Sequence, residues 1–335
     1  MTSKERYLNL LDGQPVDFIP RVPILMRYAA EYIGSNYGAF TADHRVLVAA
    51  NVRCAADFGF DQLNTMSDPL RETEGFGGKV AYDATTGVHL IEPLMPDEID
   101  LSLLVTHPDP LKATRMRDRI DAVADYHRTH GDTHSIMGWV EGAAAEAADI
   151  RGAENFFADL LTEPEAIDGL MDLCLENAIN FARIQIDQGA DTIGIGDAVA
   201  SQVSFDTYAR HILPREQKLV AALHAAGVKV RLHICGNITH ILPGLATLGI
   251  DVIDIDHMVD LRAAREALGP RVVLSANLDP VADILRGTPA SIRQRLEAAR
   301  AQAGPAFIVN AGCEIPSGTP PENLRALCEP LAIKS

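Results

Sequence analysis

The sequence predicts an α/β protein of the (β/α)8 TIM-barrel class, with an N-terminal helical extension and a hairpin inserted at the rim. Eight short apolar segments alternate with longer amphipathic segments along the chain, as parallel strands alternate with helices in βα units. Eight alternations in roughly 300 residues fit a closed barrel better than an open doubly wound sheet. No G-x-G-x-x-G pattern follows the first predicted strand, so a dinucleotide-binding sheet is not indicated.

Composition places the chain among ordinary globular proteins. Of its 335 residues, 47% are hydrophobic and 22% are charged, a balance that excludes a disordered or fibrous chain. Asp and Glu number 46 against 29 for Lys and Arg, which gives a net charge of −17. This surface field repels phosphate backbones and anionic membranes, so we expect no nucleic-acid partner.

The N-terminal segment lacks the basic and apolar regions of a signal peptide, and no window approaches 18 uninterrupted apolar residues. We therefore predict a cytoplasmic protein without membrane association. The five cysteines are sparse and odd in number, which suits a reducing compartment better than a disulfide framework. A cysteine with a special role is then expected to be a ligand or a nucleophile.

The predicted elements begin with a helix that Thr2 or Ser3 can cap and that Gly13 can end. The eight predicted strand segments follow at residues 17–25, 60–66, 134–142, 191–196, 228–235, 251–255, 271–276 and 307–311. The best-formed predicted helices lie between the later strands, at residues 164–188, 205–226, 261–268 and 290–303. Gly or Pro punctuation follows each helix near the next strand.

One irregular stretch, residues 67–100, interrupts the early part of the chain. Within it, residues 79–83 and 88–92 flank the turn 84–87, which predicts a β-hairpin. We interpret this stretch as a rim or lid insertion. Because no linker or shift in composition divides the chain, we predict a single domain over residues 1–335.

Chemically active side chains gather where the predicted strands end. In a barrel these ends meet at the C-terminal face, where function resides. The strand-end residues in question are Glu141, Asp197, His233, Cys235, Asp254, Asp256, Asn277, Asp279, Cys313 and Glu314.

The most specific pattern among them is His233-Ile234-Cys235. Residues i and i+2 of a strand point to the same face and can share one ion. Barrel closure would bring Cys313, at the end of the last strand, across the mouth toward this pair. One imidazole and two thiolates form a zinc-binding set, and three protein ligands with an exchangeable fourth position are typical of a catalytic site.

Other strand-end residues also have purely structural interpretations. Asp197 and Asp256 could cap helices or hold loop backbone, and Glu141 could do the same. The segment Asn277-Leu278-Asp279-Pro280 could be a plain turn. Three cysteines have apolar neighbours within helical segments and are predicted to be core residues: Cys54, Cys174 and Cys328.

With these strand-end residues, the chain resembles the uroporphyrinogen decarboxylase superfamily over nearly its whole length. Within it, the chain is similar to the zinc-dependent methyltransferase branch that handles corrinoid-bound methyl groups. That branch carries H-x-C and, after a long gap, a Cys in a Gly-Cys context, which here are His233-Ile234-Cys235 and Gly312-Cys313. The opening KERYLNLLDGQPVDFIPRVP, the block around Gly196-Asp197 and the segment LSANLDPVADILRGTP also resemble the superfamily.

The decarboxylase itself is similar too, and it suggests substrate-binding residues. Its N-terminal signature M-R-Q-A-G-R-Y carries two arginines for substrate carboxylates, whereas this chain has Arg27 and then Glu31 within MRYAAEY. An acid there would repel a polycarboxylate. Asp68, in Met66-Ser67-Asp68-Pro69-Leu70, resembles the catalytic aspartate of that enzyme. The resemblance thus implies substrate-binding roles for Arg27 and Asp68, to which we add the strand-end Asn277.

The resemblance implies a methyl transfer at Zn²⁺ held by His233, Cys235 and Cys313. Asp256 is our choice for a carboxylate in the fourth position, with Glu141 and Asp197 as competitors for that catalytic role. A thiolate activated by zinc would attack the methyl group of a methyl-Co(III) corrinoid and leave Co(I). The implied partners are a corrinoid protein or free cobalamin (methylcobalamin as co-substrate) and a small thiol or methyl donor; a homodimer stays open.

Several alternatives also stay open. The acceptor could be coenzyme M, homocysteine, tetrahydrofolate or another thiol. Some relatives run the first half-reaction, in which a methyl donor alkylates the corrinoid and zinc activates the leaving group. A metal-free decarboxylase or lyase would use Asp68 and Arg27. A non-catalytic corrinoid- or thiol-binding barrel would bind ligand without turnover.

Overall fold

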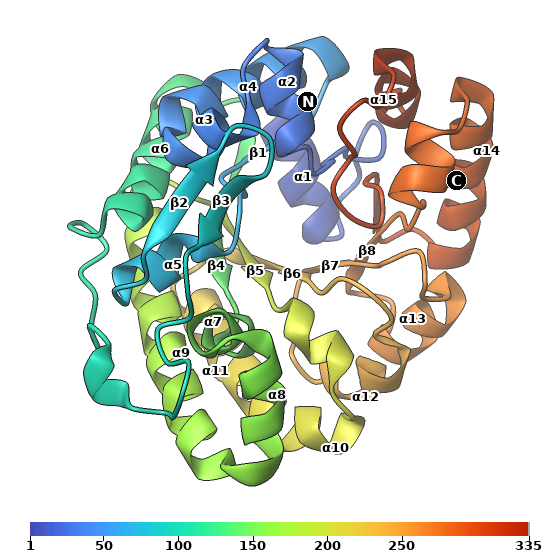
Figure 1. Cartoon of the computed structure of the whole chain (residues 1–335). Coiled ribbons are helices and arrows are strands. Elements are labelled where there is room, and N and C mark those ends of the chain that lie inside the picture. The colour runs from blue at the N-terminus through green and yellow to red at the C-terminus, as the bar shows by residue number, and fades with distance from the viewer. Residues whose placement is uncertain (334–335) are drawn as a thin grey trace.

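A parallel sheet of seven strands forms the centre of the computed structural model, which describes residues 1–333 (Figure 1). The strands follow one another around the sheet in chain order, and each pairs in parallel with its neighbour. They are β1 (Gln62–Asn64), β4 (Ser135–Glu141), β5 (Thr192–Gly196), β6 (Lys229–His233), β7 (Val252–Asp254), β8 (Val273–Ser275) and β9 (Phe307–Ile308).

The first predicted strand segment occupies the remaining position of the barrel. Arg21 forms a parallel bridge with Val309, and its carbonyl accepts a hydrogen bond from the backbone N–H of Asp61 at 2.9 Å. The segment therefore lies between the start of β1 and the end of β9, and the predicted (β/α)8 barrel is confirmed. Only a single bridge forms because Pro20 and Pro23 lack the N–H groups that a strand ladder needs.

Helices cover the outside of the sheet (Figure 1). Those that connect or follow the strands are α6 (Thr114–His130), α9 (Pro164–Asp187), α11 (Leu213–Ala225), α13 (Leu261–Leu268), α14 (Pro289–Ala303) and α15 (Pro321–Cys328). Further helical segments in the loops are α7 (Ala143–Arg151), α8 (Ala153–Thr162), η2 (Ala198–Gln202), η4 (Thr239–Ile241), α12 (Leu242–Leu245) and η5 (Pro280–Leu285).

The predicted helix at 205–226 differs in detail from the observed one. It consists of α10 (Phe205–Thr207), the π-helical turn η3 (Tyr208–Ile212) and α11. Pro214 lies in the first turn of α11 and lacks the N–H that would continue a regular α-helical ladder. The change of helix type therefore falls just before this proline.

Helix α1 (Ser3–Leu11) closes the N-terminal end of the barrel. Thr2 caps it and forms a reciprocal capping box with Glu5, in agreement with the prediction. Its fully buried Tyr7 belongs to a small apolar cluster with barrel residues Val22, Val252, Val273 and Ile308. The helices α2 (Arg27–Tyr32), α3 (Tyr37–Ala42) and α4 (His44–Phe58) follow the first strand segment.

The predicted hairpin is present as β2 (Val80–Asp83) and β3 (Gly87–Leu90), paired antiparallel. It lies against α3, where the backbone N–H of Tyr37 donates to the carbonyl of Ala84 at 3.1 Å (Figure 1). The neighbouring segments of this insertion are α5 (Leu70–Gly75) and η1 (Leu101–Leu103).

The three cysteines predicted as core residues are buried: Cys54, Cys174 and Cys328. Cys235 and Cys313 are partly exposed, and all five are free thiols. Within residues 1–333, none of the helices combines the length and the apolar character that crossing a membrane requires.

Candidate metal centre and its cavity

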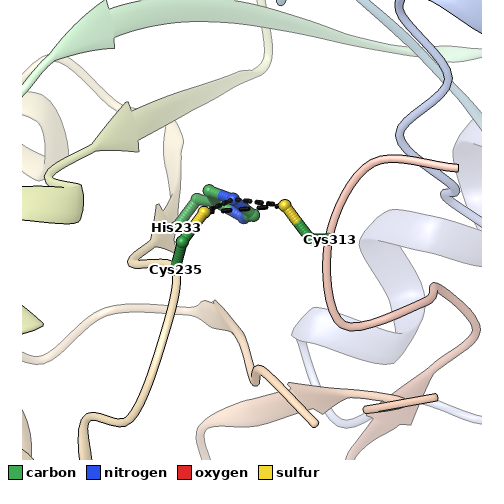
Figure 2. A group of neighbouring side chains, drawn as sticks. All are labelled: His233, Cys235 and Cys313. Atoms are coloured by element: carbon green, nitrogen blue, oxygen red, sulfur yellow. Dashed lines mark hydrogen bonds between the residues drawn. The ribbon is translucent and has the colours of Figure 1, made fainter. Parts of the chain in front are cut away.

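His233, Cys235 and Cys313 converge at the C-terminal end of the barrel strands (Figure 2). The Nε2 atom of His233 lies 3.1 Å from the sulfur of Cys235 and 3.7 Å from the sulfur of Cys313. The two sulfur atoms are 3.5 Å apart. The structure thus brings together the three side chains that the sequence predicts as metal ligands.

Local backbone geometry explains this convergence. His233 is the last residue of β6, and Cys235 follows two residues later on the same face. Gly236 then turns the chain away with a positive φ of 89°, a conformation that favours glycine. Next to Cys313, a Cβ atom on Gly312 would lie 2.9 Å from the backbone nitrogen of His257. Glycine therefore permits the loop of Cys313 to approach the loop after β7.

Asp254 orients the imidazole of His233. Its Oδ2 lies 3.1 Å from Nδ1 of His233, while Arg231 and Asn310 donate to the same carboxylate at 2.8 to 3.0 Å. An Nδ1–H donated to Asp254 leaves the Nε2 lone pair directed at the two sulfurs. A carboxylate behind a ligating histidine in this way is a recurrent feature of zinc sites.

Without a bound ion, the ionisable side chains of this group shift one another's pKa values. Burial opposes a charged imidazole, but the hydrogen bonds with Asp254 and Cys313 outweigh it and raise the pKa of His233 to about 10. The hydrogen bond from Cys235 and the neighbouring His233 lower the pKa of Cys313 to about 4, although burial opposes this shift. Burial raises the pKa of Asp254, but Arg231 and His233 lower it by more. The site therefore favours a thiolate beside an imidazolium.

A cavity of about 590 Å³ opens onto His233, Cys235 and Cys313. Its apolar wall includes Met26, Met66, Leu90, Ile91, Pro93, Trp139, Ala145, Ala148, Ala153 and Val199. Its carboxyl side chains are Asp68, Glu92, Glu141, Asp149 and Glu314. Residues of the rim hairpin and of the segment that follows it thus form part of the wall, as the prediction of a rim insertion suggested.

The three predicted catalytic carboxylates have different surroundings. Glu141 lines the cavity, and its Oε1 accepts from Arg71 at 2.7 Å and from the indole of Trp139 at 2.8 Å. Burial raises the pKa of Glu141 to about 8. Asp197 is fully buried, does not line the cavity, and accepts from the backbone N–H of Ala145 at the start of α7. For Asp197 the structure therefore corresponds to the capping interpretation.

Asp256 is not among the converging ligand atoms. Its Oδ2 accepts from the backbone N–H of Gly236 at 2.9 Å, and its Oδ1 accepts from that of Met258 at 3.0 Å. Both oxygens thus hold loop backbone beside the site. The structure does not bring Asp256 into the fourth position that the sequence suggested, because these amides already hold its carboxylate.

The predicted substrate-binding residues are also separated. Asp68 lines the cavity, but both its oxygens accept from Arg115 at 2.8 Å. Arg27 does not line the cavity; its Nε donates to Glu31 at 2.8 Å. Asn277 lies in a separate hollow of about 250 Å³ beside α13 and donates to the carbonyl of Val259. Of the three, the structure brings Asp68 alone to the cavity.

Sequence reasoning missed several cavity residues. One of them is Trp139, which lines the cavity and whose ring centroid lies 6.1 Å from that of His233. Its place two residues before Glu141 on β4 was the available signal, because both then face the same side. Asp149 also lines the cavity; an acid in the otherwise alanine-rich segment of α7 was a weaker signal.

Comparisons with known proteins agree with the fold and the ligand set. Residues 2–332 match the family model described as Uroporphyrinogen decarboxylase (URO-D). The methylcobamide:CoM methyltransferase MtbA of Methanosarcina mazei is 30% identical, and that of Methanosarcina acetivorans is 28% identical; each alignment covers 98% of this chain and 97% of the relative. A uroporphyrinogen decarboxylase of Microcystis aeruginosa is 25% identical over 98% of this chain and 97% of its own.

Solved structures show the same architecture. A methyltransferase from Methanosarcina mazei superposes with a TM-score of 0.88 at 22% identity, covering 98% of this chain and 97% of the other. A B12-independent methionine synthase from Shewanella sp. W3-18-1 superposes with a TM-score of 0.61 at 12% identity, covering 93% and 96%. Together with the sequence matches, these similarities confirm the resemblance to the superfamily and to its methyltransferase branch.

Proposed function

The chain belongs to the uroporphyrinogen decarboxylase family and is an enzyme, and we propose that it is a zinc-dependent methyltransferase. It transfers a methyl group between a corrinoid and a thiol or similar acceptor. The observation that carries this proposal is the convergence of His233, Cys235 and Cys313 on one cavity. The relatives named as methylcobamide:CoM methyltransferases support the same reaction class.

The three donor atoms fit a zinc ion. Ligand atoms about 2.0 to 2.3 Å from a tetrahedral ion lie about 3.5 to 3.8 Å from one another, and the observed separations are 3.1, 3.5 and 3.7 Å. One imidazole and two thiolates leave the fourth position to a substrate. An ion held by these three ligands would supply the Lewis acidity that keeps a substrate thiol deprotonated near neutral pH.

The chain's own residues have separate tasks in this reaction. Asp254, held by Arg231, directs Nε2 of His233 toward the two sulfur atoms with which it would hold the ion. The apolar wall excludes water from the reacting sulfur. Glu141 lines the same cavity as a carboxyl group beside Trp139 and is our remaining candidate for a catalytic carboxylate. We propose a corrinoid protein or free cobalamin as the methyl-carrying partner.

The decarboxylase alternative is less well supported. A tetrapyrrole with several carboxylates needs basic side chains around it, and no lysine or arginine within residues 1–333 lines the cavity. Arg27, the arginine retained from the decarboxylase signature, is paired with Glu31. The opposite direction of methyl transfer, from a methyl donor to the corrinoid, uses the same residues and stays part of the proposal.

The test is a spectroscopic assay with methylcobalamin and a panel of thiols and tetrahydrofolate. We expect the methyl-Co(III) absorbance to be lost with the wild type, and about one zinc ion per chain. Cys235→Ala should abolish both, whereas Cys54→Ala, in the buried core of α4, should retain both. A wild type with far less than one zinc per chain and an unimpaired Cys235→Ala variant would overturn the proposal.

A further inference from the structure

The cavity beside the candidate metal centre is rich in carboxyl groups. Five carboxyl side chains line it, and within the described part of the chain no lysine or arginine does. Glu72 and Glu146 are buried close behind the wall: the Oε1 of Glu72 accepts from the backbone N–H of Glu141, and both glutamates retain an oxygen without a hydrogen-bond partner. A bound anion would therefore find no lysine or arginine in this lining to pair with, whereas a cation would favour the ionised form of these carboxyl groups.

Two arginines offset part of this charge from behind the wall. Arg115 takes both oxygens of Asp68. Arg71 is fully buried and donates to Oε1 of Glu141. Both guanidinium groups are committed to carboxylates and lie outside the cavity lining, so they are not available to a substrate anion.

Asp149 has no such compensation from an arginine side chain. It lines the cavity from α7, and its side chain has no hydrogen bond or ion pair with any other residue of 1–333. Burial, together with Glu72 and Asp68, raises the pKa of Asp149 to about 7. A cation placed beside it would relieve this unfavourable environment.

Trp139 adds a second feature that suits a cation. Its indole lines the cavity, and its Nε1–H donates to Glu141 at 2.8 Å, which holds the ring in place. The electron-rich face of an indole attracts alkylammonium groups more strongly than other aromatic side chains do. Because Trp139 also neighbours His233, a cation on this ring would lie close to the reacting sulfur.

We propose that the small substrate of this enzyme carries a cationic ammonium group, which Asp149, Glu141 and the ring of Trp139 recognise, and that anionic thiols are disfavoured. This inference rests on the proposed methyl transfer and names the substrate class for it. The relatives are named for coenzyme M, which carries a sulfonate group. The inference predicts that this enzyme disfavours that compound. The site discriminates by charge, since all members of a short thiol series otherwise fit the cavity.

The test uses three compounds that differ only in the terminal group. Cysteamine, mercaptoethanol and mercaptoethanesulfonate carry an ammonium, a hydroxyl and a sulfonate group on the same two-carbon thiol. Binding of their S-methyl derivatives to the zinc-loaded enzyme is followed by the fluorescence of Trp139, the single tryptophan of the chain. We expect the S-methyl derivative of cysteamine to bind at least about tenfold more tightly than that of mercaptoethanesulfonate. In the methylcobalamin assay, kcat/KM should fall in the same order.

Asp149→Asn and Glu141→Gln should each reduce this preference to within about threefold. Glu154→Gln removes the same charge from an exposed position on α8 and should leave the preference unchanged. Equal or tighter binding of the sulfonate, or an unchanged preference in both cavity variants, would overturn the inference.

If fluorescence shows the ammonium preference but no thiol consumes methylcobalamin, the proposed function fails and the charge selectivity stands. If mercaptoethanesulfonate is the thiol that reacts best with methylcobalamin, the proposed function stands and the inference fails.

Discussion

Asp254 shows how one residue behind the ligands can decide whether a metal site is preorganised. It joins His233, Arg231 and Asn310 in one buried network. Without it, the imidazole could rotate or hold its proton on Nε2, and the lone pair would no longer face the sulfurs. We therefore expect the proposed zinc affinity to depend on Asp254, which is not one of the three converging ligand residues.

We predict that Asp254→Asn lowers the zinc affinity by about 10- to 100-fold, the usual effect of losing such a carboxylate. Competition with a chromogenic chelator measures this change. Asp260→Asn is the control, because it keeps an N-cap on α13 and leaves the site intact. Removal of Asp254 also deprives buried Arg231 of its partner, so near-UV circular dichroism must first show a folded variant. Unchanged affinity in the folded variant would contradict the assigned role.

Helix α1 closes the N-terminal end of the barrel. Tyr7 packs on residues of several strands, while Arg6 forms ion pairs with Asp17 and Asp61. These contacts link the N-terminal extension to the strands at the end away from the metal centre. The helix therefore contributes to stability and not to chemistry.

Tyr7→Ala should destabilise the protein by about 3 to 5 kcal/mol, as for other buried aromatic truncations, without altering zinc affinity. Urea unfolding and the chelator competition provide the two measurements. Leu161→Ala, at a position with 79% exposure on α8, should change stability by less than about 0.5 kcal/mol. A loss of zinc affinity in folded Tyr7→Ala would show that helix α1 and the candidate metal site are coupled.

The rim hairpin depends on a glycine at its turn. Gly87 has a φ of 81°, and a Cβ atom there would lie 2.8 Å from the ring of Tyr37. The Tyr37 hydroxyl in turn donates to the carbonyl of Ser67, next to Asp68. The turn is therefore linked through α3 to one wall of the cavity.

Gly87→Ala should lower the thermal unfolding midpoint by more than Gly34→Ala does. Gly34 has a similar φ of 76° but no atom within 4 Å of an added Cβ. Both variants incur the cost of a positive φ, about 1 kcal/mol, and the difference isolates the clash with Tyr37. Equal midpoints would mean that Tyr37 moves aside freely.

For the whole molecule, the alternation of strands and helices was sufficient to predict the barrel, because each βα unit must bury an apolar strand under a helix. The same logic predicted His233, Cys235 and Cys313, since strand ends meet at one face. It could not show that the first segment forms a single bridge. Pro20 and Pro23 remove backbone N–H donors, and the effect depends on how the segment pairs with its neighbouring strands. Nor could a local pattern reveal that the distant Arg115 pairs with Asp68.

A second property of the whole molecule is the pH dependence of its stability. Burial raises the pKa values of Glu141 and Glu216 to about 8 and those of Asp149 and Asp197 to about 7. In the unfolded chain such groups release their protons near pH 4. Between about pH 5 and pH 8 the folded state therefore binds more protons than the unfolded state, and stability falls as pH rises. Asp68 and Asp254 have lowered pKa values and stay ionised in both states over this range.

Asp197→Asn should reduce that pH dependence. The amide cannot ionise, while its Oδ1 can still accept from Ala145 as the carboxylate does. Removing the charge at Asp197 also removes a repulsion that raises the pKa of Glu216. We expect the free energy of unfolding of the variant, measured with urea, to rise relative to that of the wild type from pH 5 to pH 8, by at most about 1.4 kcal/mol per pH unit for one proton. Because the proposed zinc binding would strengthen with pH in both proteins, the difference between them isolates the carboxyl group. Glu154→Gln, at an exposed position, should run parallel to the wild type. A variant curve parallel to the wild type would mean that Asp197 is already ionised in the folded protein at pH 5.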